Sequence, residues 1–468
     1  MFSSVKSFFV KYKKFFYVLG ILILSVILIL FVLAQFASRG AAGIFNREMA
    51  KQQMLRGTIT VEKISANING DVVFENLLWL EPDGDVILSV PEGSFHARPW
   101  DVITRNIKST TIQKLELKNA LISVRFDEEM RLDFLKQKRR PKKKPGNVKK
   151  GKAGKSPNVT GSIGNINFNR GGRRLRVNIG LNNCRLEARY RNRHYIMNNV
   201  NMGMRLFTSG VSRINMSTGK FGGTMHGGGL SIAGTIDFKK KTPEADLDVS
   251  LRDVDPSSLG FGINIHDLMT VVAKIEGPVT GPRGRGTVKM KELNLPALPF
   301  RDVVGDVHYS NGVFRFSDVH ANVFGGSLTA RGDYNMDNRR YNIYGVGKKL
   351  DSKRALRELR FSCLVDLELT VRCDGNPKNI LAYGNFKSGK GHYSIIPFDS
   401  LEGRFTNRFK ELHIYDAKII TPVATITTDA FSIVRGKLTM KPVLITDPDT
   451  GKVVTYKRKS KKKAKKVR

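Results

Sequence analysis

The residues that could carry out chemistry are few and widely spaced in this chain. Its 468 residues include eight histidines and three cysteines, and no His-Glu-x-x-His motif is present to hold a zinc ion. Cys184, Cys363 and Cys373 are too scattered for a disulfide framework or a zinc site, although the last two could pair if they lie on adjacent strands. We therefore expect half-buried thiols, no metal site and no cofactor.

A glycine-rich segment is the second place where chemistry could be located. Gly222-Gly223 and the run at 227–229 are not followed by the Gly-Lys-Ser/Thr sequence that completes a phosphate-binding loop. A turn is the ordinary interpretation of such a run. No motif resembles a nucleophile accompanied by its general base. We expect that the protein is not an enzyme.

An alternation of apolar and polar residues is the most widespread pattern in the sequence. Apolar and polar residues alternate along many segments, as in Leu247, Val249 and Leu251 with polar residues between them. Successive side chains of a β-strand point to opposite faces, so each such strand has one apolar face. An antiparallel sheet can leave a face in water only if that face is polar. The apolar faces therefore need a second sheet or a different cover.

The elements that must position these residues are almost all strands. Strand-like alternation begins near Ile59 and recurs as far as Val371 and beyond. We expect short helices at 41–55, 99–103 and 352–361. The last of these is too short and too charged to cover a long sheet. The predicted fold is therefore mainly β, an elongated antiparallel sheet with few short helices.

A long apolar segment precedes the strands. Residues 15–37 contain twenty-three positions without a charge, which as a helix would be about 35 Å long and able to cross a bilayer. The positive-inside rule predicts a cytoplasmic N-terminus and an exported remainder, because lysines and no acids precede this segment. These topology-setting residues are Lys6, Lys11, Lys13 and Lys14. A cleaved signal peptide is the alternative, but its apolar core is usually about 7–15 residues long.

The net charge of +38 is concentrated in two tracts. Residues 136–155 carry eleven Lys and Arg and no acid, and residues 457–468 carry nine Lys and Arg and no acid. The β-rich remainder is mildly basic, and a domain outside the cytoplasm rarely meets nucleic acid, so we expect no nucleic-acid partner. The tracts are either solvated tails or attachment sites for anionic surfaces.

The exported part is repetitive, with a period of 98 residues, which predicts a stack of similar β units. Seven residues between positions 277 and 318 have counterparts one period later. The first set is Gly277, Gly286, Pro299, Phe300, Gly305, Phe316 and Asp318. Their counterparts, in the same order, are Gly375, Gly384, Pro397, Phe398, Gly403, Ile414 and Asp416. We expect a cytoplasmic N-terminus at 1–14, a transmembrane helix at 15–37, a β region at 38–135, a basic disordered loop at 136–157, the repetitive β region at 158–456 and a basic tail at 457–468.

Several of these segments resemble the AsmA-like family, which includes TamB. Residues 275–282 with 286–288, and residues 319–332, are similar to the exported repeats of that family. Residues 56–61 and 75–84 follow the predicted anchor as they do in the family. The resemblance covers nearly the whole chain except the two basic tracts.

The resemblance implies a single-pass inner-membrane protein of a diderm bacterium, with its bulk in the periplasm. It further implies a long, twisted, taco-shaped β-groove that carries phospholipid tails between the inner and outer membranes. The chain is shorter than large members of the family, and it ends in the basic tract 457–468 rather than in an apolar segment. This departure from the family does not fit insertion of the chain's end into an outer-membrane barrel. An outer-membrane protein and an anionic envelope polymer are the further partners that we consider.

On this hypothesis twenty apolar residues line the groove wall, with lipid tails as the cover. The candidates are Leu230, Ile232, Ile236, Leu247, Val249, Leu251, Val271, Ala273, Ile275, Val288, Met290, Phe314, Phe316, Leu328, Val365, Leu367, Leu369, Val371, Leu412 and Ile414.

Alternatives to the groove stay open at this point. The apolar rows could instead pack on one another in an ordinary β-sandwich or barrel array. The protein could also be an envelope scaffold or an outer-membrane protein assembly factor that pairs with the exposed strand edge of a partner, or it could dock through its basic tracts. The lack of sandwich-sized segments and the 98-residue repeat favour the groove.

Overall fold

A computed structural model describes residues 42–51, 55–103, 111–126, 175–259, 265–295, 298–355, 361–408, 411–434 and 437–456. The predicted membrane helix at 15–37, the four topology-setting lysines and both basic tracts lie outside these residues. Within the described residues, no helix combines the length and the apolar character that a membrane crossing requires.

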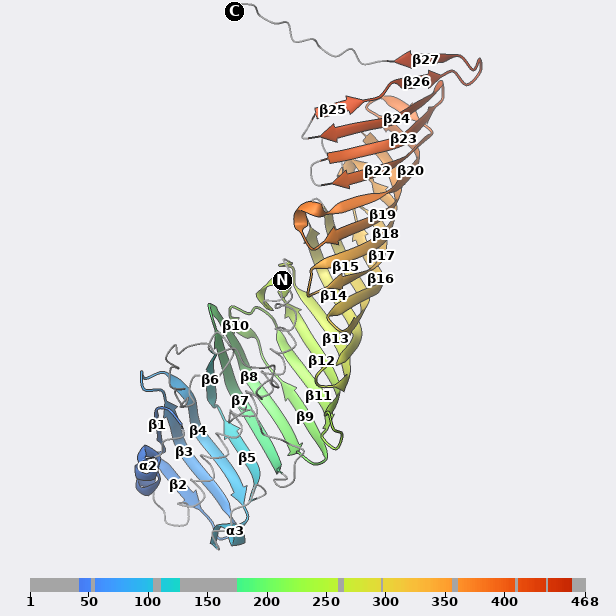
Figure 1. The fold of residues 1–468 in the computed structure, drawn as a ribbon. Coiled ribbons are helices and arrows are strands. Elements are labelled where there is room, and N and C mark those ends of the chain that lie inside the picture. Colours follow the sequence, from blue (N-terminus) through green and yellow to red (C-terminus); the bar gives the residue numbers. More distant parts are fainter. Residues whose placement is uncertain are drawn as a thin grey trace, which may run out of the picture. The chain divides into compact units, whose positions relative to one another are not determined.

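The described chain is mainly β and divides into two compact units (Figure 1). Unit 1 comprises residues 1–254 and 274–282, and unit 2 comprises residues 255–273 and 283–468. Strand β13 (Met269–Pro278) has residues in both units.

The strands of unit 1 are β1 Thr58–Thr60, β2 Lys63–Ala66, β3 Asp71–Leu80, β4 Val86–Ala97, β5 Ile112–Lys118, β6 Leu121–Phe126, β7 Arg176–Tyr190, β8 Arg193–Phe207, β9 Val211–Ser217, β10 Phe221–Gly223, β11 Gly229–Asp237 and β12 Glu244–Val254. The strands of unit 2 are β14 Arg283–Leu295, β15 Leu298–Ser310, β16 Val313–Val323, β17 Gly326–Asn335, β18 Arg340–Asp351, β19 Phe361–Asp374, β20 Leu381–Tyr393, β21 Ile396–Phe398, β22 Ser400–Arg408, β23 Glu411–Thr421, β24 Ala424–Val434, β25 Lys437–Met440, β26 Val443–Thr446 and β27 Val453–Tyr456.

Most pairings in unit 1 are antiparallel, as expected, but two are parallel. Strands β5 and β6 follow one another along the chain and both pair in parallel with the long strand β7. Asn119 between them has φ of 52°, which bends the chain without ending the shared pairing. Strands β7, β8 and β9 then lie side by side as antiparallel neighbours (Figure 1).

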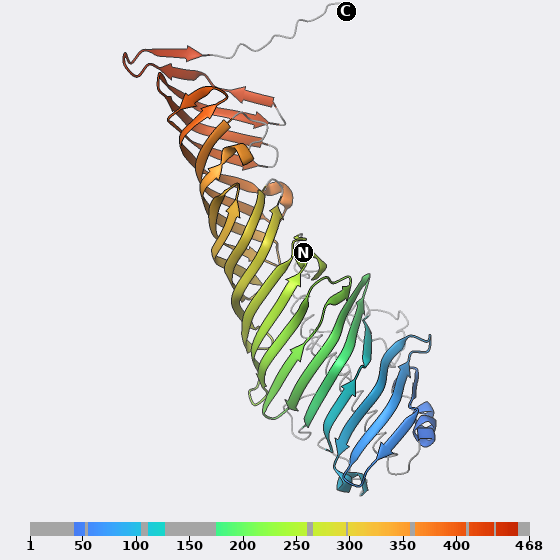
Figure 2. The same cartoon turned by 180° about the vertical axis from the view of Figure 1, so that it is seen from behind.

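In unit 2, strands β14 to β20 pair antiparallel with their neighbours in the chain (Figure 2). Further along, β21 and β22 both pair with β20, and β25 and β26 both pair with β24. Short hairpins make this possible, as at the link between β15 and β16. Asn311 and Gly312 there have φ of 49° and 78°, the positive values that a tight type I′ turn requires at both positions. Ser310 and Val313 pair on either side of this turn, so the Asn-Gly pair forms a two-residue hairpin.

The helices are short and lie beside the sheets. They are α2 Ala42–Lys51, α3 Pro99–Ile103, α4 Ser352–Ala355 and the 3₁₀ turns η1 Pro256–Leu259 and η2 Pro377–Asn379. The predicted helices at 41–55 and 99–103 are confirmed by α2 and α3, except that Leu55 is not helical; residues 41 and 52–54 lie outside the described residues. The predicted helix at 352–361 is confirmed at 352–355, whereas Phe361 begins β19, and residues 356–360 lie outside the described residues.

Helix α2 closes one end of the sheet in unit 1. Phe45 and Met49 are buried against the sheet. The Asn46 side-chain amide donates to the Val61 carbonyl at 3.0 Å and its oxygen accepts from the Val61 N–H at 2.8 Å. A side chain thus satisfies backbone groups at an edge that would otherwise be open to another strand.

Positions related by the 98-residue period adopt the same backbone conformation. Gly277 and Gly375 have φ of 99° and 101°, and Asp318 and Asp416 have φ of 48° and 49°. Such left-handed values are uncommon outside glycine, so their recurrence reflects a shared local structure.

Candidate functional site

The six candidates on β11 and β12 share one face of unit 1. Leu230 is directly opposite Leu251, Ile232 is opposite Val249, and Ile236 is opposite Ala245. Leu247 is opposite Gly234 in the same row. Cross-strand partners lie on the same side of a sheet. We call the side that carries these residues the apolar face of unit 1.

This face continues over strands that the sequence-based candidates did not include. Ile232 is opposite Met216 on β9, and Met216 is opposite Met202 on β8. Leu181 on β7 is opposite Met202 in turn. The apolar alternation at Met202 and Met204 could have identified these positions. Methionine is flexible and polarisable, so this part of the face can adapt to ligands of irregular shape.

Unit 2 presents an equivalent apolar face. One row of cross-strand partners runs over β17, β18, β19 and β20. Its members, in that order, are Leu328, Gly347, Leu367 and Phe386. Leu369 and Val371 alternate with Leu367 on the same side. We call the side that carries these residues the apolar face of unit 2.

The remaining candidates in unit 2 belong to the same rows. Phe316 is opposite Gly332, and Ile414 is opposite Phe405. The other candidates that the register places on this face are Val288, Met290, Phe314, Val365 and Leu412. Phe405, like Phe386, is a member that the sequence-based candidates did not include.

The three candidates on β13 also share one side of their strand. Val271, Ala273 and Ile275 alternate along it. A Cβ placed on Gly286 would come within 2.6 Å of the Ala273 Cβ, so Ala273 and Gly286 lie on the same side of the sheet in unit 2.

The candidates are mostly half-buried rather than enclosed. Met290 is 7% exposed and belongs to a small cluster with Val303 and Ala321, whereas the other nineteen candidates retain partial exposure. Ile343, in the same row as Val371, is 38% exposed. The inner faces of a β-sandwich would bury such rows completely. Among the described residues, the apolar face of unit 2 is therefore an open surface and not a closed core.

An aromatic row crosses the apolar face of unit 2. Tyr309 and Phe314 are paired, with ring centroids 5.0 Å apart, and Phe314 is opposite Tyr334, which is opposite Tyr341. Burial raises the pKa of Tyr341 to about 12, and Cys373 beside it adds to this shift. Burial also raises the pKa of Tyr309 and Tyr334. The face is thus a poor environment for charge, as an apolar ligand requires.

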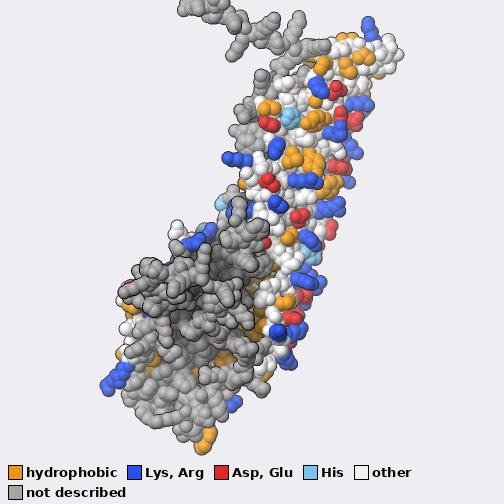
Figure 3. All heavy atoms as spheres, viewed as in Figure 1, with side chains coloured by type: hydrophobic (Ala, Val, Ile, Leu, Met, Phe, Trp, Pro, Cys, Tyr) orange, Lys and Arg blue, Asp and Glu red, His pale blue; other side chains and the backbone are white. Residues whose placement is uncertain are grey.

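The opposite sides of the same strands are polar. Lys274 bonds Asp246 at 3.2 Å in unit 1, and Arg404 pairs with Asp416 in unit 2. Figure 3 shows Lys and Arg side chains interspersed with Asp and Glu over unit 2. In each unit the two sides of the sheet therefore differ in chemistry.

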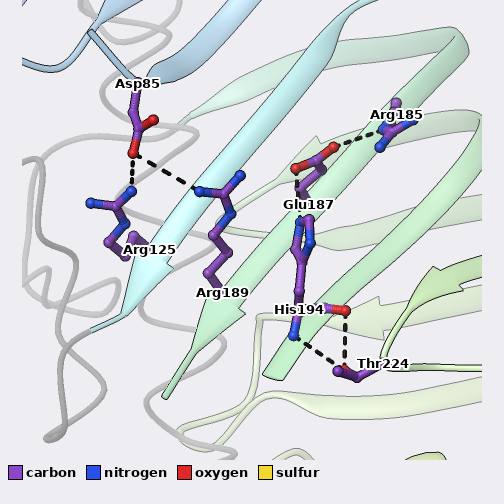
Figure 4. A network of polar contacts seen from close by, with 7 residues as sticks. All are labelled: Asp85, Arg125, Arg185, Glu187, Arg189, His194 and Thr224. Carbon is purple, nitrogen blue, oxygen red and sulfur yellow. Dashed lines mark hydrogen bonds and ion pairs between the residues drawn. The ribbon is translucent and has the colours of Figure 1, made fainter. Parts of the chain in front are cut away.

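Two polar networks on unit 1 were not anticipated (Figure 4). In the first, Arg125 on β6 is directly opposite Arg189 on the parallel strand β7. Asp85, from the turn before β4, hydrogen-bonds Arg125 and lies 3.9 Å from Arg189. This carboxylate offsets the repulsion between two like charges that face each other across strands.

The second network is centred on Glu187, a buried carboxylate on β7 (Figure 4). Burial alone would raise its pKa, but hydrogen bonds from His194 at 2.9 Å and Arg185 at 2.7 Å hold the pKa below its usual value. The His194 backbone also exchanges two hydrogen bonds with the Thr224 hydroxyl. These contacts join β7 to β8 and to the segment after β10, and their role is structural.

Comparison of the chain with protein-family models, with curated proteins and with solved structures found no match.

The three cysteines are free. Cys363 and Cys373 are both on β19, ten residues apart, so they are separated by about 33 Å in an extended strand. A disulfide requires Cα atoms within about 7 Å, so the pairing considered from the sequence cannot form between them.

Proposed function

We propose that the protein is a passive lipid-transfer conduit whose apolar faces hold phospholipid acyl chains. The observation that carries this proposal is the one-sided, half-buried apolar face of unit 2, whose rows of Leu, Val and Phe have no enclosing layer among the described residues. Acyl chains would supply the missing cover.

The energetics support an acyl ligand. Burying one methylene group contributes about 0.8 kcal/mol, so a tail of ~15 methylenes could gain about 12 kcal/mol when fully covered. This gain can offset the cost of moving a tail out of a bilayer. The phosphate headgroup can stay in water at an open edge, which avoids the cost of burying a charge.

The cellular setting forms part of the same proposal. The apolar segment 15–37 and the resemblance to the AsmA-like family support an inner-membrane anchor with the strands in the periplasm. Transfer between the inner and outer membranes then follows from that location. The partners would be membrane phospholipids, and no cofactor is required because the transfer breaks no bond.

A lipid-transfer assay with matched substitutions tests the proposal. The full chain is reconstituted in donor vesicles, and transfer of a fluorescent phospholipid to acceptor vesicles is measured. Val249→Asp and Leu367→Asp place a charge on the apolar faces and are expected to lower the rate by about tenfold or more, because an unpaired charge there disfavours the tail.

The control variants place the same charge on the polar side of the same two strands. Ser250 and Thr370 lie on the polar sides of β12 and β19. Ser250→Asp and Thr370→Asp should therefore leave transfer within about twofold of the unchanged protein. If Val249→Asp and Leu367→Asp unfold the protein, as judged by circular dichroism, these positions are closed core and the proposal fails.

One observation favours a second candidate function, that of a strand-pairing scaffold. Strand β27 pairs with β26 alone among the described strands, and Val453, Val454 and Tyr456 are 54%, 55% and 56% exposed. A short apolar edge of this kind can accept a strand from a partner. Val454→Pro should abolish binding of a partner strand and leave lipid transfer unchanged. A variant that loses lipid transfer but still binds the partner would contradict this second function.

A further inference from the structure

The polar face of unit 1 has a hollow where two glycines meet. Gly180 on β7 is directly opposite Gly203 on β8, so neither strand places a side chain at this point. Glu116 on β5 and Asn215 on β9 flank the glycine pair in the same row. The result is an open hollow of about 630 Å³ on the side away from the apolar face.

Two arginines face each other along the rim of this hollow. Arg205 on β8 is directly opposite Arg213 on β9, and both line the hollow and are exposed. Asn178, opposite Arg205 on β7, and Lys114, opposite Asn178 on β5, extend the row. Like charges directly opposite each other across strands are unfavourable unless an anion lies between them.

The acidic residues of this row and of the neighbouring row are already paired with other side chains. Glu116 pairs with Lys114 at 2.8 Å, and Asp71 pairs with His96 at 2.6 Å. Asp246 pairs with Lys274 at 3.2 Å. No carboxylate of the described residues forms an ion pair with Arg205 or Arg213. This contrasts with Arg125 and Arg189, a facing pair of arginines for which Asp85 supplies the counter-charge.

We propose that this hollow is an anion site that binds a phosphate group. The Arg205 and Arg213 guanidinium groups each present a planar set of N–H donors that matches phosphate oxygens. Asn178 and Asn215 add amide donors on either side, and the glycine floor leaves room for the ligand. The bound phosphate would supply the counter-charge for Arg205 and Arg213, as the Asp85 carboxylate does for Arg125 and Arg189. This site is independent of lipid transfer along the apolar faces.

Protection of the arginines from chemical modification tests the proposal. The full chain in a neutral detergent is treated with phenylglyoxal, and modification of each arginine is measured by mass spectrometry. Sodium phosphate at about ten times its Kd should slow the modification of Arg205 and Arg213 by about tenfold. Arg252, exposed on β12, serves as the internal reference. Sodium chloride at the same ionic strength controls for screening.

Two arms distinguish the sources of the phosphate. Protection by inorganic phosphate but not by phosphatidylglycerol added to the detergent micelles would indicate a soluble phosphate compound. Protection by phosphatidylglycerol micelles in phosphate-free buffer would indicate a lipid headgroup. The proposal would be overturned if neither phosphate nor phosphatidylglycerol protects Arg205 and Arg213 more than Arg252. It would also be overturned if sodium chloride protects Arg205 and Arg213 as well as phosphate does.

Substitutions give a second, independent readout by phosphate titration calorimetry. Arg205→Gln with Arg213→Gln should weaken phosphate binding by about tenfold or more, because hydrogen bonds to a charged group are lost. Arg252→Gln with Lys220→Gln removes the same total charge from exposed positions and should leave the affinity within about twofold. Equal weakening by the two double variants would reduce the effect to net charge and contradict a specific site.

Filling the hollow tests its shape without changing its charge. A Cβ at Gly203 would meet no atom within 4 Å, so the fold accepts a side chain there. Gly203→Leu should abolish protection of Arg205 and Arg213 by phosphate. Undiminished protection in this variant would show that phosphate binds elsewhere.

Discussion

The alternation of single residues determines which side of each strand meets water. On β19, Leu367 and Leu369 lie on the apolar face, whereas Glu368 between them lies on the polar side. This property could be predicted from the sequence, because successive strand residues point to opposite sides whichever strands are neighbours. The pairing of Asp85 with Arg125 could not, because the two residues are 40 positions apart and alternation carries no information about such distant contacts.

The tyrosine row gives a prediction about high pH. The folded chain favours the neutral form of Tyr341, whose pKa is raised from 10.0 to about 12. Its contribution to stability is therefore complete below pH 10 and is lost as the pH rises toward 12. Phenolate absorbance should show a late-titrating component that Tyr341→Phe reduces, the remainder coming from Tyr309 and Tyr334. A titration with every tyrosine ionising near pH 10 would contradict the apolar character of this face.

Glu187 gives the corresponding prediction at low pH. Because its folded pKa is depressed, its contribution to stability is complete above its ordinary pKa of 4.5 and is lost as the pH falls below that value. Glu187→Gln should lower the free energy of unfolding at pH 7 by about 1–3 kcal/mol. In urea unfolding the difference from the unchanged protein should shrink on acidification below pH 4.5. A difference that stays constant with pH would rule out this role.

At the scale of elements, glycine allows neighbouring strands to approach closely on the apolar face. A Cβ at Gly384 on β20 would lie 1.9 Å from the Glu368 carbonyl oxygen on β19. A Cβ at Gly286 would lie 2.2 Å from the Val272 carbonyl oxygen. These two glycines are equivalent in the 98-residue period, so the repeat in the sequence corresponds to a recurring backbone contact.

Gly384→Ala should therefore destabilise the pairing of β19 with β20. Overpacking of this kind costs about 1–3 kcal/mol, because backbone must move to accommodate the added atom. Gly389→Ala on the same strand is the matched control, since a Cβ there meets nothing within 4 Å. Hydrogen exchange of the β19 and β20 amides measures the difference. Equal protection in the two variants would contradict the close approach.

The elements themselves were predictable to different degrees. Helices α2 and α3 follow from local signals, such as Pro99 at the start of α3. The parallel pairing of β5 and β6 with β7 does not, because β6 and β7 are separated by nearly fifty residues and a strand's pattern fixes its faces but not its neighbours. The edge contact of Asn46 with Val61 is also invisible in a pattern of apolar residues.

At the scale of the molecule, function depends on what covers the apolar faces of the two units. Alternation along the strands predicted that such faces exist, and register places the candidates on them. The hypothesis of lipid tails as the cover rests on the partial exposure of these rows and on the resemblance to the AsmA-like family. No sequence pattern could specify partial exposure, because exposure depends on every neighbouring element.

Photocrosslinking tests most directly whether lipid occupies the apolar face. Phe386 and Tyr383 are aromatic residues on the same strand, β20, but on its apolar and polar sides respectively. Each is replaced in the full chain by p-benzoylphenylalanine, the cells are irradiated, and phospholipid attached to the purified protein is measured by mass spectrometry. We expect phospholipid adducts at position 386 and none above background at position 383. Equal labelling at the two positions, or no adduct at position 386, would show that lipid does not bind specifically to the apolar face.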